Sequence, residues 1–388
     1  MGPGSNAIKT YHAHQADPLP LHSSGRLSST LGKQTENTPL SKIINIQALR
    51  GVAVLLVVLF HLVTIEQKYG GVKTILPNFL NVGMFGVDLF FVISGFVMVS
   101  VTKGKFLNIK HAAQFLYHRA SRIYPTYWVY SLLVLGVFLF KPTLVNSSQG
   151  NEVNIVASFL LLPSDRLPLV MVGWTLIHEM YFYLVYFFIL LFISEKHLVN
   201  ALVLWAAVII GANFSLELAT PFEKLVFHPL TIEFIFGCFV AIYYFRKNNK
   251  ILREDLLLSL AAVGFIAMIY GQNLYYQHTE SFEPQGWWRI LIFGLPALSI
   301  VFYFINAERN GFVFHSSLVR IGDTSYSIYL SHILTLSAVG RIWSSFSIDS
   351  TWDNVIMIPI LLISAIIVGM LSYRYVERPL LTYSRRIA

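Results

Sequence analysis

Repeated long apolar segments constrain this chain more than any other feature of its sequence. A segment of about 20 mostly apolar residues is long enough to cross a bilayer as a helix. Ten such candidates follow one another from about residue 45, and 55% of the 388 residues are hydrophobic while only 12% are charged. We therefore predict an all-α, polytopic membrane protein with about ten transmembrane helices. The predicted spans are 46–66, 82–102, 123–140, 172–193, 198–213, 228–245, 255–271, 288–306, 324–341 and 354–376.

The sequence around these spans divides the chain into three regions. Residues 1–44 are polar and rich in Ser, Thr, Pro and His, which predicts a disordered N-terminal tail. Residues 45–380 form the predicted transmembrane domain, and residues 381–388 a short basic C-terminal tail. The polar start has no apolar h-region, so no cleavable signal peptide is expected. The short apolar piece Val153–Leu162 cannot cross a bilayer and is expected at its surface.

The basic residues predict how the spans are oriented. With the N-terminus inside, 21 of the 28 Lys and Arg residues fall on the cytoplasmic side. Cytoplasmic loops of membrane proteins carry such an excess, so we expect both termini in the cytoplasm. The same loops explain the net charge of +8 without nucleic-acid binding. A single cysteine, Cys238, excludes an internal disulfide and a multi-cysteine metal site, and no metal is expected.

The first span contains two residues that a bilayer normally excludes, Arg50 and His61. They are eleven positions apart, so at roughly 100° per residue they lie on one face of a helix. At 1.5 Å per residue they are about 16 Å apart along the axis. A cation at the membrane surface and an imidazole in line with it near mid-membrane indicate the two ends of one site. The alternative is an interfacial anchor and a hydrogen-bonded core histidine.

Further titratable residues fall at a similar depth in other spans. Asp88, Glu179 and Glu233 lie in the outer halves of the second, fourth and sixth spans, and His178 precedes Glu179. Burying each group separately would cost about 2.5–3.5 kcal/mol, so shared partners or a water-filled cavity are expected. His332 lies in the middle of the ninth span. It is either a site residue or a core histidine with a satisfied hydrogen bond.

A second set of charged residues lies at the cytoplasmic ends of the predicted spans. It consists of Arg50, the closely spaced pair Arg119 and Arg122, and the C-terminal Arg374 and Arg378. Guanidinium groups gathered at a pocket suit bidentate recognition of phosphate. The alternative, that they are topology signals and lipid contacts, is strongest for Arg374 and Arg378.

Short motifs along the chain, in their order, are together similar to those of one family. The sequence resembles the integral-membrane acyltransferase-3 family, and its wording around residue 174 is closest to the bacterial exopolysaccharide O-acetyltransferase branch. The motifs that carry the resemblance are Arg50 with His61, Gly86–Phe96, Arg119–Pro125, Trp174–Glu179, Tyr326–His332 and Val376–Pro379.

The resemblance implies an enzyme of the bacterial inner membrane that moves an acyl group, most often acetyl, from acyl-CoA to a hydroxyl of a glycan or lipid-linked sugar. It implies that His61 acts as general base, with Asp88 or Glu179 fixing its tautomer. An acyl-histidine intermediate is the alternative to direct transfer, and a homodimer is one option for the assembly. The remaining expected roles are CoA binding by Arg50, Arg119, Arg122 and Arg378, and substrate binding by Trp174, His178, Glu233 and His332.

A function from another class competes with this interpretation. A proton-coupled transporter or lipid flippase also places titratable groups within the membrane, as a proton relay. Inverted repeats are typical of many transporters, and the two halves of this chain share no recurring motif. The acyltransferase is therefore the preferred hypothesis, and neither the acceptor nor the acyl chain follows from the sequence.

Overall fold

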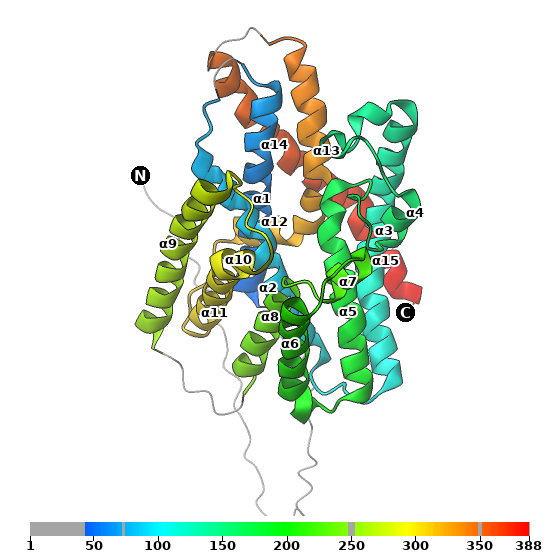
Figure 1. Cartoon of the computed structure of the whole chain (residues 1–388), viewed down its shortest axis with the longest axis vertical. Helices are drawn as coiled ribbons and strands as arrows, with labels where there is room; N and C mark the ends of the chain where they lie inside the picture. The colour runs from blue at the N-terminus through cyan, green and yellow to red at the C-terminus, as the bar shows by residue number, and fades with distance from the viewer. Residues whose placement is uncertain (1–42, 72–73, 247–252, 348–350, 388) are drawn as a thin grey trace, which may run out of the picture. The chain divides into compact units, whose positions relative to one another are not determined.

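The protein is helical throughout the part that the computed structural model describes, residues 43–71, 74–246, 253–347 and 351–387. No strand occurs in these ranges, which confirms the predicted all-α class. The predicted N-terminal tail lies outside them except for its last two residues. The α-helices, shown in Figure 1, are α1 Ile44–Tyr69, α2 Phe85–Thr102, α3 Ile109–Phe140, α4 Ile155–Leu160, α5 Trp174–Phe192, α6 Leu198–Ser215, α7 Pro221–Val226, α8 Thr231–Tyr244, α9 Glu254–Thr279, α10 Gly286–Arg289, α11 Leu295–Arg309, α12 Ser316–Asp323, α13 Ser325–Ser344, α14 Thr351–Ser372 and α15 Arg378–Ile387.

Short helical turns of other types connect several of these helices. Two of them are π-helical and continue directly into an α-helix, α11 in one case and α15 in the other. The 3-10 turns are Asn78–Met84, Pro142–Leu144, Ser147–Gln149, Met171–Gly173 and Glu195–His197, and the π-helical turns are Ile290–Gly294 and Tyr373–Glu377.

Within the described ranges, nine helical segments are long and apolar enough to cross a membrane. They correspond to nine of the ten predicted spans, and α4, in the short apolar piece before Pro163, is only six residues long. The remaining predicted span, the ninth, is present as α13, a helix of 20 residues that contains polar side chains such as Ser327, Ser331 and His332. All three are buried, because α13 packs between α1 and α14. The polytopic helical class is confirmed, while the sidedness of the termini stays a prediction.

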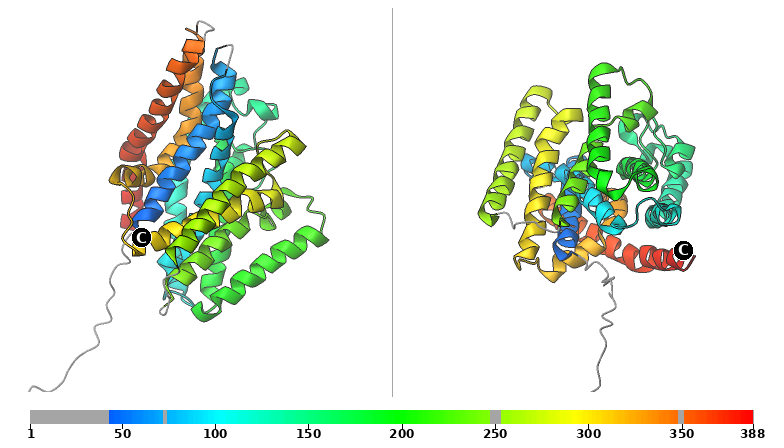
Figure 2. Two further views of the ribbon diagram at one scale, coloured as in Figure 1. Left: turned by 90° about the vertical axis from the view of Figure 1, so that its left-hand side faces the viewer. Right: turned by 90° about the horizontal axis from the view of Figure 1, so that it is seen from below.

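Among the described membrane-length helices α2 and α8 are the most buried, followed by α1, and these three form the centre of the bundle. α2 packs against α8 on one side and α1 on the other, and α1 also contacts α12 and α13. By contrast, α9 lies at the edge of the bundle in both Figure 1 and Figure 2. Its side chains Val263 and Ile266 are exposed, as expected for a face in contact with lipid.

Glycines allow α2 to approach both of its neighbours closely. A Cβ atom added at Gly95 would lie 1.9 Å from the carbonyl oxygen of Phe234, and one at Gly237 would lie 1.9 Å from that of Val92. Gly86 approaches α1 in the same way. Small residues at these points bring the backbones together, as is common between membrane helices.

Gly237→Ala is expected to destabilise the protein, because the new methyl group forces α2 and α8 apart. Overpacking of this kind costs about 1–3 kcal/mol. Gly211→Ala in α6 is the matched control, since a Cβ there meets nothing within 4 Å and alanine is the better helix former. Thermal unfolding of both variants in one detergent checks this expectation. Equal melting temperatures for the two variants would contradict it.

Candidate active site

Three arginines from two helices gather around a cavity inside the bundle. Arg50 belongs to α1, and Arg119 and Arg122 lie one turn apart on α3. The cavity lies between α2, α3, α5 and α13, and its unfilled space, including the part open to solvent, is about 750 Å³. The arginines are at one end of it, and the rest of the wall is largely apolar and aromatic. That wall includes Val87, Phe90, Phe91, Ile93, Val97, Met98, Leu176, Tyr326 and Tyr329.

The same three arginines line a second, larger hollow of about 1350 Å³. Its other residues come from the N-terminal half of α3, the end of α12 and the C-terminal helices, and they include His118, Glu377 and Arg385. The arginines thus stand where the two spaces meet. An extended ligand with an anionic end and an apolar arm would fit this arrangement, with its charge at the arginines and its arm in the inner cavity.

Three carboxylates accompany the arginines: Asp323 and Glu377 line the larger hollow, and Glu179 lines the inner cavity. Glu179 accepts hydrogen bonds from the hydroxyl of Tyr183 and from Ser94 Oγ, the latter at 3.1 Å. Glu377 accepts one from Ser327 Oγ at 2.6 Å. With Arg385, which also lines the larger hollow, four guanidinium groups face three carboxylates around the two spaces.

One donor in this cluster has no protein partner. The Nε–H of Arg119 is buried, and among the described residues no acceptor is within hydrogen-bonding distance of it. Arg50, in contrast, donates from Nη2 to Ser325 Oγ at 3.1 Å. Buried polar groups are nearly always hydrogen-bonded, so an unpaired guanidinium N–H at a cavity indicates a place for an anionic ligand.

Arg378, the fourth predicted CoA-binding arginine, does not join this cluster. It is exposed and lines a separate surface hollow with Arg374 and Arg386. Its neighbour Glu377 is buried instead and faces the arginine cluster. The two residues lie at the junction of the π-helical turn with α15, where adjacent side chains point in different directions, so only one of them reaches the site.

His61 lies beside His332, and their hydrogen bond joins α1 to α13. The distance from His332 Nε2 to His61 Nδ1 is 3.3 Å, and the ring centroids are 4.9 Å apart. Neither histidine lines the inner cavity. The nearest link is Tyr329, which lines that cavity and whose ring centroid is 5.8 Å from that of His332. The histidine pair therefore lies next to the cavity wall, close to Phe90, which packs against Tyr329.

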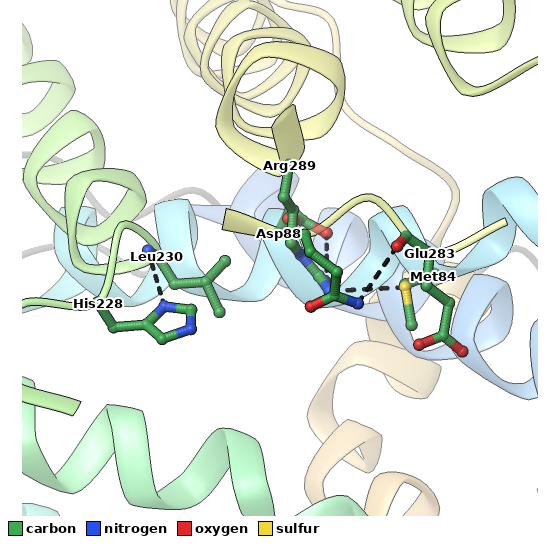
Figure 3. A network of polar contacts seen from close by, with 7 residues as sticks. Met84, Asp88, His228, Leu230, Glu283 and Arg289 are labelled. Atoms are coloured by element: carbon green, nitrogen blue, oxygen red, sulfur yellow. Dashed lines mark hydrogen bonds and ion pairs between the residues drawn. The ribbon is translucent and has the colours of Figure 1, made fainter. Parts of the chain in front are cut away.

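Asp88 is occupied by a partner that the sequence analysis did not identify. Its carboxylate receives two hydrogen bonds from Arg289, at 2.8 Å from Nε and 2.9 Å from Nη2, and both side chains are buried (Figure 3). Arg289 also lies over the ring of Trp174, 5.7 Å from its centroid. The expectation that Asp88 orients His61 is therefore corrected, because the guanidinium of Arg289 holds the carboxylate. Glu179, the other expected partner, lies at the arginine cluster rather than beside His61.

Glu233 is fully buried beside this ion pair, with its carboxyl group against that of Asp88, and no N–H or hydroxyl group of the described residues donates to it. Its carboxylate packs against the backbone of Gly294, where an added Cβ would lie 2.9 Å from Oε1. Gly294 ends the π-helical turn that begins directly after Arg289. Glu233 is therefore not placed against a cavity, and its expected role in substrate binding has no support from its position.

Trp174 and His178 line a third hollow, on the other side of α5 from the arginines. It encloses about 770 Å³, and His228 and Lys224 also contribute to it. The rings of His178 and His228 are 4.5 Å apart, and His178 Nδ1 is buried without a partner in the described ranges. His228 was not predicted, because one histidine in a loop carries no pattern. Its Nδ1 accepts a hydrogen bond from the backbone N–H of Leu230 (Figure 3).

The fold and the site show that the protein is a polytopic helical membrane protein with an arginine-lined internal cavity. Residues 43–374 match the family described as "Acyltransferase domain", and the chain belongs to this acyltransferase-3 family. The resemblance seen in the motifs is thereby confirmed. No solved structure gave a significant match to the chain.

Characterised relatives of the chain fall into two groups. The chain is 28% identical over 319 residues to the "Exopolysaccharide production protein ExoZ" of Rhizobium meliloti. This match covers 79% of this chain and 92% of that protein. It is 21% identical over 364 residues to the "O-acetyltransferase OatA" of Staphylococcus aureus and 24% identical over 394 residues to the "Peptidoglycan O-acetyltransferase OatA" of Listeria monocytogenes. The matches cover 86% and 90% of this chain but only 56% and 57% of those two proteins.

Proposed function

We propose that this membrane acyltransferase transfers an acyl group, acetyl in the first instance, from acyl-CoA to a hydroxyl group of a glycan or lipid-linked sugar. The observation that carries the proposal is the position of Arg50, Arg119 and Arg122 at the junction of two hollows. CoA has an anionic nucleotide end and a long, largely uncharged arm that ends in the thioester. The phosphates would lie against the arginines in the larger hollow, and the arm would extend into the inner cavity toward Tyr329.

In this proposal His61 removes the proton from the acceptor hydroxyl as its oxygen attacks the thioester carbonyl carbon. The carbon–sulfur bond then breaks, and the imidazolium returns the proton to the departing thiolate. A positioned base of this kind contributes about 10²–10⁴-fold to the rate. The position of His61 beside His332, directly behind the cavity residue Tyr329, supports this assignment.

The acceptor is proposed to approach from the opposite end of the bundle. Trp174 and His178 line a hollow that α5 separates from the arginines, and an aromatic ring with polar side chains is a suitable surface for a sugar. The printed names of the relatives, an exopolysaccharide production protein and peptidoglycan O-acetyltransferases, support a glycan acceptor. With cytoplasmic termini in a bacterial inner membrane, this hollow would face the extracytoplasmic side.

Arg122→Ala is expected to weaken acetyl-CoA binding by about 10–100-fold. A hydrogen bond to a charged group is worth about 1.5–3 kcal/mol, and each 1.4 kcal/mol is a tenfold change in Kd. The matched control is Arg386→Ala, an exposed arginine outside the cluster, which should bind as the wild type does. Isothermal titration of the purified proteins with acetyl-CoA measures both.

Two outcomes of this titration would change the proposal. If the wild-type protein does not bind acetyl-CoA, the acyl-CoA donor is wrong, and ion-coupled flux should be measured next. If both arginine variants lose affinity equally, the effect is one of overall charge, and the arginine cluster is not the CoA site.

A further inference from the structure

The hydrogen bonds around the histidine pair determine which nitrogens carry protons. His332 Nδ1 lies 2.7 Å from the carbonyl oxygen of Tyr329 and 3.2 Å from that of Ile328. A carbonyl oxygen can only accept, so Nδ1 of His332 must be the protonated nitrogen. In the neutral ring its Nε2 is then an unprotonated acceptor, and this is the atom that faces His61.

The same reasoning extends to His61. Its Nδ1 lies 2.9 Å from the carbonyl oxygen of Val57 and 3.3 Å from Nε2 of His332. Both neighbours are acceptors, so Nδ1 of His61 must carry the proton and share it between them. The neutral ring of His61 therefore has its lone pair on Nε2, and among the described residues no hydrogen-bond partner occupies that nitrogen.

From this arrangement we propose that His332 is the positioning residue of the base, and that it, rather than a carboxylate, holds His61 as the tautomer with a free Nε2. The proposal rests on the proposed acyl transfer and deepens it. In a catalytic triad an aspartate accepts the Nδ1 proton of the histidine and fixes the ring. Here the lone pair of a second imidazole takes that place.

The surroundings of the pair support a fixed geometry. His332 is fully buried, and its two carbonyl contacts come from its own helix, so its ring cannot turn without losing them. His61 is only partly buried and has the ring of Phe60 on another side, with 5.0 Å between centroids. The carboxylates that were expected to orient His61 are held elsewhere, Asp88 by Arg289 and Glu179 by Ser94 and Tyr183.

A neutral partner has a chemical consequence for the transfer step. When His61 Nε2 takes the proton of the hydroxyl, the imidazolium keeps its Nδ1–H, which is still shared by Val57 and His332. The positive charge is then stabilised by two neutral acceptors and is not cancelled by a buried anion. The imidazolium can then return its Nε2 proton to the CoA thiolate as the carbon–sulfur bond breaks.

Three substitutions of His332 separate positioning from packing. In His332→Gln the side-chain amide oxygen reaches the position of Nε2 and can still accept from His61. In His332→Asn the amide is too short for this and reaches only the position of Nδ1. His332→Leu fills the space of the ring without any polar atom.

The test measures transfer of labelled acetyl from acetyl-CoA into the endogenous acceptors of membrane vesicles that contain each variant. The expected result is that the Gln variant keeps kcat within about tenfold of the wild type, while the Asn and Leu variants lose about 10²-fold. KM for acetyl-CoA should stay unchanged in all three, because His332 lies outside the arginine cluster. A Leu variant with wild-type kcat, or a Gln variant as impaired as the Leu variant, would overturn the proposal.

A second measurement does not require the three His332 variants. Solid-state NMR of wild-type protein with ¹⁵N-labelled histidine, compared with His61→Gln, identifies the signals of His61 and thus its tautomer. We expect a protonated Nδ1 and an unprotonated Nε2, and the opposite tautomer would overturn the proposal. If the wild type itself transfers no acetyl group, the proposed function has failed, and the NMR result still decides the tautomer.

Discussion

His61→Ala should abolish acyl transfer while leaving the protein folded and able to bind acetyl-CoA. The expected loss in rate is at least the contribution of a general base, about 10²–10⁴-fold. The Kd for acetyl-CoA should not change, because His61 lies outside both arginine-lined hollows. Labelled acetyl transfer in membrane vesicles and titration of the purified protein measure the two quantities separately.

The chain provides a closely matched control for this substitution. His278 near the end of α9 also places Nδ1 against the carbonyl oxygen four residues earlier, at 2.8 Å from that of Leu274, but it is exposed and has no second histidine. His278→Ala should leave transfer at the wild-type level. Full activity in the His61 variant, or equal losses in both, would show that His61 is not the base.

The second large effect is expected from the buried ion pair. Asp88→Leu and Arg289→Met should each destabilise the protein by about 3–5 kcal/mol, because each leaves one charge buried without its partner. The double variant should be more stable than either single variant, since both charges are then removed together. Thermal unfolding in detergent of the four proteins of this cycle gives the coupling between the two side chains.

Additive effects in this cycle would mean that the two side chains do not depend on each other, contrary to the structure. The same cycle also bears on the competing function. A proton relay needs carboxylates that are free to move between partners, and the two hydrogen bonds from Arg289 hold the carboxylate of Asp88 in place. If the double variant still transfers acetyl groups, the ion pair serves the fold and the placement of Trp174 rather than proton movement.

The position of α5 connects the donor and acceptor parts of the proposed site. Glu179 faces the arginine-lined cavity, and Trp174 and His178 face the hollow on the other side of the same helix. The first two turns of α5, which carry the motif from Trp174 to Glu179, thus contribute residues to both spaces. Arg289, the last residue of α10, contacts both Asp88 and Trp174 and thereby connects α2, α5 and α10.

The sequence by itself determined which segments become helices of the bundle and that titratable side chains such as His61, Asp88 and Glu233 lie within them. Apolar length is a local property, so nine of the ten spans could be located from it, and α13 was found despite its polar side chains. Helical spacing placed Arg119 and Arg122 on one face, and both line the predicted phosphate-binding cavity with Arg50.

The tertiary structure alone decided which polar group meets which. The rotation of each helix and the π-helical turns after residues 289 and 372 decide two pairings. Asp88 meets Arg289 rather than His61, and Glu377 rather than Arg378 enters the site. A polar side chain within an apolar span must find a partner in the membrane, but the hydropathy of the span does not identify that partner. That choice arises from contacts between segments far apart in the chain, and for this reason the pairing of His61 with His332 became visible only in the folded protein.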